Sequence, residues 1–464
     1  METTTIALSA RSVERMQAVV AQRVDSLIRD YKIMMERTRD GNAATDTDWA
    51  FVKRVRQLRV FQRLKTSMAV PPPDPDLVGN RLQVPDMLAV GAVEGGTLHD
   101  LMYALVSCSN RDAAIKSVVT DDALVHSTLL STVVAPTPSE PFESFNIKRS
   151  LLRKPRVVGH LMRDRDVVYL EATGITNIRG THERVGYHVI QSVELPAVRE
   201  LHERGIVRST ASMVYIFIEE PVAAAQNAIR VLGQGAINPL GDIPTPLAAK
   251  WTCDSLLAVD QLLPLAHLKK LTRMAQLGAR QWSDCDDNLP SYREEDLGST
   301  LRDTMTTLSC RICSRLLCSK CCARQQLAAI PALAKTPLEH AVTMCDYCID
   351  AAGLRDAREF AAHDAREALA LAPSPRYVAH YFQPHPEIPT SSHRQRAASA
   401  FSTLSSVLRL VLPGPSSDST GSRRRAASHS NIRKSPRLLW RTRSPGSRRT
   451  SRELLGLNPD GIML

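Results

Sequence analysis

The stretch Met213-Val-Tyr-Ile-Phe-Ile218 contains only apolar residues, most of them β-branched or aromatic, a composition typical of a buried strand. Two segments of similar composition precede it, Val167 to Glu171 and Val185 to Val193, and turn residues separate the three. We therefore expect three or more antiparallel strands in this part of the chain.

A long helix is predicted after these strands. Its apolar residues recur at near-helical spacing, and Gly278 closes it; they are Trp251, Leu256, Val259, Leu263, Leu268, Leu271 and Met274. Pro264 is expected to kink or divide this helix, because proline removes a backbone donor and clashes with the preceding turn. The helix would cover one face of the sheet, which gives an α+β fold class.

Residues 1–44 are predicted to hold one amphipathic helix that ends before Asp40-Gly41. Its apolar stripe consists of Met16, Val20, Val24, Leu27, Tyr31 and Met34. Near the other end, residues 350–372 are polar and rich in alanine, so we expect a helical appendix that faces solvent.

The net charge of +11 is concentrated in the C-terminal tail, residues 384–464. From residue 385 onward 14 Lys and Arg oppose 4 Asp and Glu, which accounts for +10. Few apolar residues accompany them, so this tail is predicted to be disordered. Its sparse aromatic content argues against nucleic acid as a partner. Ser399 and Ser428 follow Arg-rich triplets and are candidate phosphorylation sites.

No apolar run approaches the length of a membrane span, and no secretory h-region is evident near the start. We therefore expect a cytoplasmic protein. Of its ten cysteines, eight fall between Cys285 and Cys348, which points to metal binding in a reducing compartment. Cys108 and Cys253 lie in apolar surroundings and are expected to be buried free thiols.

Three C-x2-C pairs occur in this region: Cys310 with Cys313, Cys318 with Cys321, and Cys345 with Cys348. A tight C-x2-C turn can place two thiolates on one Zn²⁺, and a structural zinc site needs four such ligands. The spacing therefore predicts one or two bound Zn²⁺ ions. Reduced structural cysteines and an iron–sulfur cluster are the alternatives, although the bacterial cluster motif has a different spacing.

The segment from Ser309 to Cys321, followed by Met344-Cys-Asp-Tyr-Cys348, resembles the second half of a FYVE-type zinc finger, which would occupy residues 282–349. The resemblance implies that Cys310, Cys313, Cys345 and Cys348 share one ion. It assigns Cys318 and Cys321 to a second ion whose other cysteine pair is absent. Cys285 is the candidate to complete that second, degenerate site, together with Asp284, Asp286, Asp287, Cys322 or His340.

FYVE fingers bind phosphatidylinositol 3-phosphate through a basic strand, and here that strand reads Thr306-Thr-Leu-Ser-Cys-Arg311. Only Arg311 remains as a candidate head-group ligand, so specific phosphoinositide binding is weakened. The resemblance implies membrane or protein recognition, peripheral on endosomal membranes. A RING-like ubiquitin ligase or a protein-binding scaffold is the alternative, although a RING finger needs a histidine that is absent between Cys313 and Cys318.

Residues 45–278 resemble START-like lipid-binding domains of the kind that precede FYVE fingers in oomycete proteins. The matching stretches include Gly95 to Ala104, Arg165 to Glu171, Gly186 to Val193 and the helix from Trp251 to Met274. The resemblance implies a helix-grip fold, with an antiparallel sheet over a long C-terminal helix and room for one lipid. Arg165, Glu171, Tyr187 and His188 would supply the polar groups of its pocket.

The alternatives are that apolar side chains fill a solid core and that these polar residues lie on a solvated face. Gly233-Gln-Gly235 lacks the strand-to-helix context of a phosphate-binding loop. No motif places a nucleophile beside a base, so we expect a non-catalytic lipid-binding or adaptor protein.

Overall fold

The structure is a computed structural model of the 464-residue chain. It describes residues 6–39, 49–64, 86–107, 124–152, 163–178, 180, 183–219, 228–241, 243–278, 308–317, 322–329 and 338–371. The tail with Ser399 and Ser428 lies outside these ranges, as do Cys108, Cys285, Cys318 and Cys321. Among the helices of the described residues, none is both long enough and apolar enough to cross a membrane.

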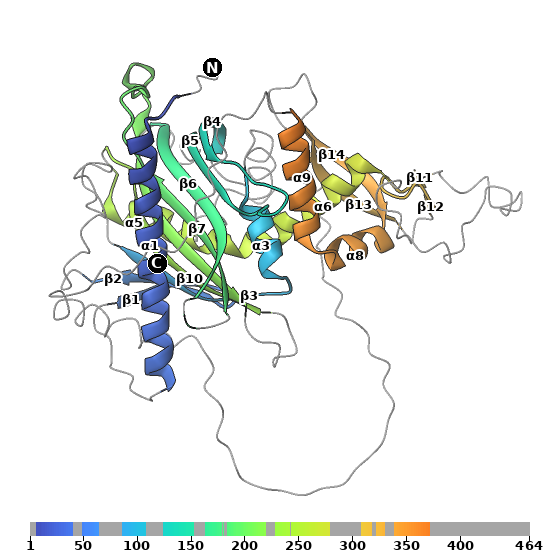
Figure 1. The fold of residues 1–464 in the computed structure, drawn as a ribbon, viewed down its shortest axis with the longest axis horizontal. Helices are drawn as coiled ribbons and strands as arrows, with labels where there is room; N and C mark the ends of the chain where they lie inside the picture. Colours follow the sequence, from blue (N-terminus) through green and yellow to red (C-terminus); the bar gives the residue numbers. More distant parts are fainter. Residues whose placement is uncertain are drawn as a thin grey trace, which may run out of the picture.

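Between residues 49 and 238 the described chain consists mainly of strands, and helices lie around the sheet that they form (Figure 1). The first part contains α1 (Ala10–Arg39), β1 (Trp49–Val55), β2 (Leu58–Arg63), β3 (Met87–Glu94), α3 (Leu98–Leu105), β4 (Leu124–Val134), β5 (Ser144–Leu152), β6 (Arg165–Asn177), β7 (Arg184–Ser192), η2 (His202–Arg204), β8 (Val207–Arg208), β9 (Thr210–Glu219) and β10 (Ala228–Asn238). The second part contains α5 (Thr245–Leu257), η3 (Ala258–Gln261), α6 (Leu262–Leu277), β11 (Leu308–Ser309), β12 (Leu316–Leu317), β13 (Cys322–Ala329), β14 (Leu338–Cys345), α8 (Asp346–Leu354) and α9 (Ala357–Leu371).

The large sheet has the order β1-β2-β3-β10-β9-β7-β6-β5-β4, and β8 adds a short parallel pairing to β6. Every pairing along that order is antiparallel. The predicted strands therefore form an antiparallel sheet, in which β9, β7 and β6 are consecutive neighbours. Successive side chains of a strand point to opposite faces of the sheet, so the helices on one face pack against a different set of side chains from the helices on the other.

α1 covers the outer face of the sheet, which we define as the face that carries Val189, Val214 and Ile216 (Figure 1). The predicted apolar stripe of α1 is confirmed, since Met16, Val20, Val24, Leu27 and Tyr31 are all buried in one cluster with these strand residues. The structure does not describe the side chain of Met34. Burial of this stripe, rather than helix propensity, is what stabilises such a helix.

Two helices, α3 and α5, cover the inner face, which carries Met213, Tyr215 and Phe217, and α6 packs against α3 in the same apolar cluster. The predicted long helix is confirmed, and it is divided as expected. α5 ends at Leu257, the 3-10 helix η3 intervenes, and α6 begins two residues before Pro264. Gly278, at φ 70°, is the C-cap of α6. The predicted α+β helix-grip class is thereby confirmed.

The position of α3 depends on two local features. Thr97 caps its N-terminus in a capping box with Asp100, which satisfies backbone donors that have no partner within the helix. Gly186 on β7 leaves room for the helix, because a Cβ there would lie 2.6 Å from the Met102 Sδ and 2.8 Å from the Leu98 Cδ1. The helix can therefore approach the inner face closely.

The C-terminal unit, formed by β11 to β14 with α8 and α9, packs against α3 and α6. The expectation that residues 350–372 form a solvated appendix is wrong. Phe360 is fully buried at 0% exposure, and Ala357, Ala361 and Ala365 are buried beside it. Phe360 lies 6.2 Å from Tyr103 of α3, ring centroid to ring centroid. A single apolar cluster therefore continues from the sheet into this unit.

Candidate functional site

Two clusters of side chains could carry function: four cysteines in the C-terminal unit and three ionisable residues on the inner face of the sheet. The cysteine cluster begins with a tight turn between β11 and β12. In that turn the Cys310 amide donates to the Arg315 carbonyl at 2.8 Å, and the Ser314 amide donates to the Cys310 carbonyl at 2.9 Å. Ser314 adopts φ 60°, which reverses the chain after Cys313.

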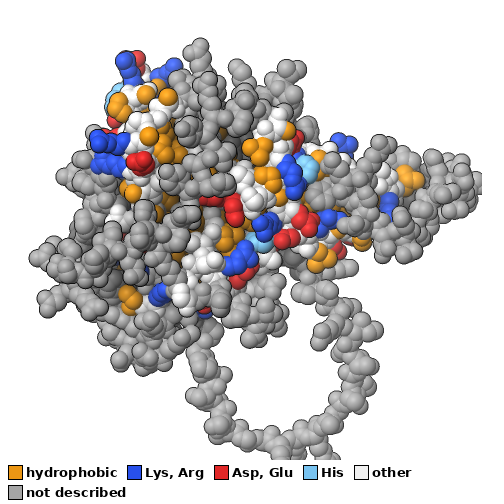
Figure 2. Space-filling view, in the orientation of Figure 1, with side chains coloured by type: hydrophobic (Ala, Val, Ile, Leu, Met, Phe, Trp, Pro, Cys, Tyr) orange, Lys and Arg blue, Asp and Glu red, His pale blue; other side chains and the backbone are white. Residues whose placement is uncertain are grey.

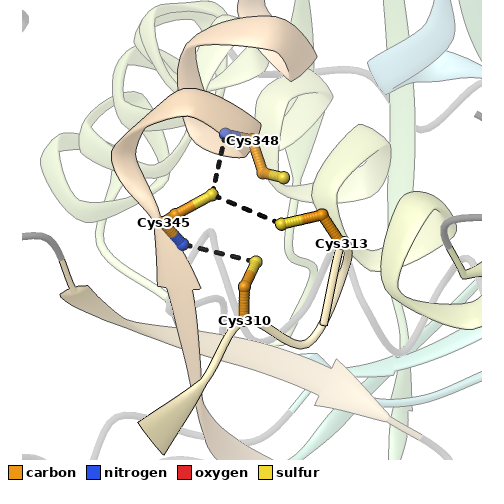
Figure 3. A group of neighbouring side chains, drawn as sticks. All are labelled: Cys310, Cys313, Cys345 and Cys348. Carbon is orange, nitrogen blue, oxygen red and sulfur yellow. Dashed lines mark hydrogen bonds between the residues drawn. The ribbon is translucent and has the colours of Figure 1, made fainter. Parts of the chain in front are cut away.

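The second half of the cluster lies where β14 meets α8. Cys345 is the N-cap of α8, and its Sγ accepts from the Cys348 amide at 3.4 Å. The Cys345 amide in turn donates to the Cys310 Sγ at 3.4 Å, which joins the two halves (Figure 3). The Arg311 amide also donates to the Thr343 carbonyl at 2.9 Å. The turn and the helix start are thus fixed relative to each other.

The sulfur positions fit a single metal ion. All four Sγ atoms lie within 4.8 Å of one another, and the Cys313 and Cys345 Sγ atoms are 3.8 Å apart (Figure 3). Four thiolates bonded to Zn²⁺ at about 2.3 Å in a tetrahedron have S···S edges of about 3.8 Å. The four thiols are free rather than disulfide-bonded, and Cys310, Cys345 and Cys348 are buried. Together they could hold one metal ion.

Hydrogen bonds among the four thiols give them unequal acidities. The hydrogen bond with Cys313 lowers the pKa of Cys310, whereas hydrogen bonds with Cys310 raise the pKa of Cys345 and of Cys348. A divalent cation would stabilise all four thiolates together. Of the other predicted zinc ligands, Cys318, Cys321 and Cys285 lie outside the described residues.

The inner face carries a cluster of three ionisable residues, Lys148, Glu171 and His188, which we call the charged triad although the histidine is charged only when protonated. The Lys148 Nζ lies 2.5 Å from the Glu171 Oε2, and the His188 Nε2 lies 2.9 Å from the Glu171 Oε1. All three side chains are buried. Lys148 also donates to the Ser107 carbonyl, which follows α3 directly. The triad therefore lies beneath the C-terminal end of α3.

The surroundings of the triad divide the inner face into a polar and an apolar part. The His188 ring stacks on Tyr215 at 5.9 Å between centroids, and Ser150 hydrogen-bonds to Tyr169 at 3.0 Å. Burial raises the pKa of Tyr215 and of Tyr169, so both phenols stay protonated. Beyond Tyr215 the face is apolar, with Met87, Ala89, Phe217, Val231, Leu58 and Val60.

The structure separates the pocket residues predicted from the sequence. His188 and Glu171 lie together in the triad, but Tyr187 lies on the outer face, in the apolar cluster of α1. Arg165 binds the Pro239 and Leu240 carbonyls at 3.3 and 3.4 Å and stacks over Trp251 at 5.7 Å. Desolvation by burial lowers its pKa. Arg165 thus ties β6 to the segment that leads into α5.

Lys148 was not predicted as a site residue. In its strand, polar and apolar residues alternate from Ser144 to Lys148, as they do on a half-solvated sheet. Arg311, the predicted head-group ligand, has an exposed side chain beside the cysteine cluster. Gly233 lies in β10 and leaves room for the Tyr215 ring, since a Cβ there would lie 2.6 Å from the Tyr215 Cδ1.

No family model and no curated protein matches the sequence. Among solved structures, the chain is similar to human StAR-related lipid transfer protein 5, with 13% identity and a TM-score of 0.34 over 54% of this chain and 97% of that one. It is also similar to human STARD10, with 12% identity and a TM-score of 0.31 over 50% and 77% of the two chains. A STAR-related lipid transfer protein fragment from Xanthomonas axonopodis shows 17% identity and a TM-score of 0.30 over 47% and 96%.

Proposed function

We propose that this chain is a non-catalytic protein that binds a lipid against the inner face of its sheet and holds Zn²⁺ in its cysteine cluster. One observation carries the lipid proposal. The charged triad lies buried beside the apolar part of the inner face, and a lipid with a polar head group and an apolar tail would match the two parts. The head group would lie at Lys148, and the acyl or ring portion would lie along Met213 and Phe217.

The energetics of the triad support a role in recognition. Burying a Lys–Glu pair costs several kcal/mol per ion in desolvation, and apolar residues of similar size are often equally stable. The pair is therefore poorly explained by stability alone. Lys148 donates to the Ser107 carbonyl on the covering segment, a bond that a phosphate or hydroxyl oxygen of a lipid would replace.

Lipid transfer by a charge-neutral pair variant tests this proposal. Lys148→Met with Glu171→Gln is expected to weaken binding of pyrene-labelled phosphatidylcholine by about 10- to 100-fold, the loss of one charged hydrogen bond to the ligand, and so to reduce its transfer between vesicles. The matched control is Lys53→Met with Asp254→Asn, another Lys–acid pair at 2.8 Å whose side chains are 46% and 43% exposed. Equal transfer by both double variants would contradict the proposal.

We propose Zn²⁺ as the metal because four thiolates form a soft, tetrahedral ligand set. We further propose that the unit is a FYVE-type finger that serves membrane or protein recognition, in the cytoplasm and peripheral on endosomal membranes. The exposed side chain of Arg311 supports a head-group contact. The basic tail supplies attraction to anionic lipid of about 1 kcal/mol for each basic residue near the surface.

Flotation with phosphatidylcholine vesicles, with and without phosphatidylinositol 3-phosphate, tests the membrane role. Arg311→Ala is expected to reduce flotation with the phosphoinositide vesicles, whereas Arg366→Ala, at an exposed position of α9, is expected to leave it unchanged. Equal flotation of the two variants would contradict head-group binding by Arg311 and favour protein recognition as the role of the finger.

A further inference from the structure

α6 carries three buried cations within about one helical turn: Lys269, Lys270 and Arg273. Lys270 is 2% exposed, and Lys269 and Arg273 are each 7% exposed. A charge removed from water in this way destabilises a fold unless partners compensate it. The partners of these three residues therefore show which elements α6 holds.

Lys269 holds the end of α3. Its Nζ donates to the Tyr103 and Val106 carbonyls at 2.7 and 2.9 Å and lies 4.3 Å from the centre of the Tyr103 ring. The last carbonyls of a helix have no partner within it, and they carry the negative end of its dipole. A buried ammonium therefore satisfies the C-terminus of α3, next to the Ser107 carbonyl that binds the triad.

Lys270 joins α3 to α8. Its Nζ lies 2.5 Å from the Asp100 Oδ1 in α3 and donates to the Arg355 carbonyl at 2.7 Å. Arg355 is the C-cap residue of α8. One side chain of α6 thus binds the first turn of α3 and the C-terminal end of α8.

Arg273 joins α6 to α9. Its Nε forms an ion pair with the Asp364 Oδ1 at 2.8 Å, and its guanidinium also contacts His363 and Glu367. The Tyr103 hydroxyl donates to the other Asp364 oxygen at 2.9 Å. The guanidinium lies among the side chains of His363, Asp364 and Glu367, so these three residues of α9 bind α6 through Arg273.

The junction also has a polar rim at the surface. Figure 2 shows basic, acidic and histidine side chains gathered where α3 meets α9. The His99 Nε2 accepts from Arg184 at 2.7 Å, so its Nδ1 carries the proton and donates to the Asp356 Oδ1 at 2.8 Å. Arg358 donates to the Ser139 carbonyl at 2.8 Å. The C-terminal unit is therefore fastened, both in the interior and at the surface, to the sheet domain, which we define as the large sheet with α1, α3, α5 and α6.

α8 connects this junction to the cysteine cluster. The helix has nine residues, with Cys345 as its N-cap and Cys348 in its first turn, and its C-cap carbonyl is the one bound by Lys270. So short a helix is unstable alone and depends on what holds its ends. A metal ion on Cys345 and Cys348 would fix its first turn, and Lys270 fixes its last.

We propose that metal binding at the cysteine cluster acts as a latch that holds α6 against α3 and thereby holds α3 over the charged triad, so that metal loss loosens both helices and speeds lipid exchange. The effect on lipid exchange, the lipid part of the proposal, rests on the proposed function. The loosening of α3 and α6, the helix part, does not.

Hydrogen exchange of the full chain, zinc-loaded and after chelation, tests the helix part. Chelation is expected to raise amide exchange in α3 and α6 by about 5- to 150-fold, the usual range for coupled sites, while β6 and β7 change much less. An increase confined to residues 308–354 would overturn the latch, because the metal would then stabilise its own unit alone.

A variant separates the latch from the metal. Lys270→Met is expected to raise exchange in α6 while the zinc content stays unchanged, and chelation then adds little more. Lys250→Met, at a position whose side chain is 51% exposed on α5, is the matched control. Glu367→Gln removes one charge from the Arg273 contacts and gives a milder second test if Lys270→Met folds poorly. If chelation raises amide exchange in α6 of the Lys270→Met variant as much as it does in the Lys250→Met variant and in the parent chain, the latch is overturned.

Transfer of pyrene-labelled phosphatidylcholine between vesicles tests the lipid part. Chelation and Lys270→Met are each expected to speed loading and release of the probe. Absence of transfer in every state, with α3 and α6 still responding to chelation, would refute the proposed function and leave the helix latch standing. Transfer at a rate independent of both zinc and Lys270 would refute the lipid part of the latch.

Discussion

Phe360→Ala is expected to destabilise the sheet domain, although Phe360 lies well over a hundred residues after its last large strand. The side chain is 0% exposed and packs 6.2 Å from the Tyr103 ring, centroid to centroid, in the apolar cluster that α3 and α6 share. Truncating a fully buried phenylalanine to alanine costs about 3–5 kcal/mol, the sum of lost burial and a residual cavity. The loss applies to α3 as well as α9 because both helices line the cavity.

Urea unfolding followed by tryptophan fluorescence measures this effect, since Trp49 lies in β1 and Trp251 in α5. The matched control is Leu369→Ala, an apolar truncation in the same helix at a side chain that is 43% exposed. The control is expected to change the free energy of unfolding by no more than about 0.5 kcal/mol. If Phe360→Ala shifts the transition no more than Leu369→Ala does, α9 does not stabilise the sheet domain, and the docking described above is refuted.

Three further outcomes follow from the geometry. Cys348→Ser is expected to remove the metal ion of the cysteine cluster in a zinc assay of the purified chain, whereas Cys253→Ser, at a buried free thiol outside the cluster, is expected to retain it; retention by both would contradict the four-cysteine site. Burial lowers the pKa of His267 from 6.5 to about 4, so the unfolded chain takes up the proton first and stability is lost as the pH falls through that window. His267→Gln is expected to remove this acid-induced loss of stability, which amounts to at most about 3 kcal/mol, when urea unfolding is measured as a function of pH. His202→Gln, whose side chain is 67% exposed, is the control, and identical pH profiles for the two variants would refute the assignment. Thr97→Ala removes the capping box of α3 and is expected to cost about 1 kcal/mol in the same assay, while Thr137→Ala in a loop serves as control; no difference between them would contradict the cap.

The sheet and its covering helices were predictable because their signals are local. Strand composition in Met213 to Ile218 and helical spacing from Trp251 to Met274 depend only on neighbours in sequence. The division before Pro264 follows from the covalent structure of proline. Strand geometry alone also separates Tyr187 from His188, because adjacent residues of a strand point to opposite faces.

The burial of α9 was not predictable in this way. Its inward face consists of Phe360 among alanines, and alanine gives a weak hydropathy signal that also suits an exposed helix. The spacing of Ala357, Phe360, Ala361 and Ala365 is the one signal that could have revealed the stripe. Burial of Lys269, Lys270 and Arg273 has no local signal, since it depends on carbonyls and carboxylates supplied by three other helices.

The candidate functional sites also include one that was predictable from the sequence and one that was not. The C-x2-C spacing identifies a metal-binding segment from sequence, because each pair forms its own tight turn. The charged triad draws Lys148, Glu171 and His188 from three strands. Their alternating polar pattern is that of a solvated face, and only the cover of α3 shows it to be buried.

Native mass spectrometry of the purified full chain tests the central claim most directly, because one spectrum reports bound metal and bound lipid together. The parent chain is expected to carry zinc and a co-purified lipid. The double variant Lys148→Met with Glu171→Gln is expected to keep the zinc and lose the lipid. A chain without zinc, or a lipid retained undiminished in that variant, would contradict the claim.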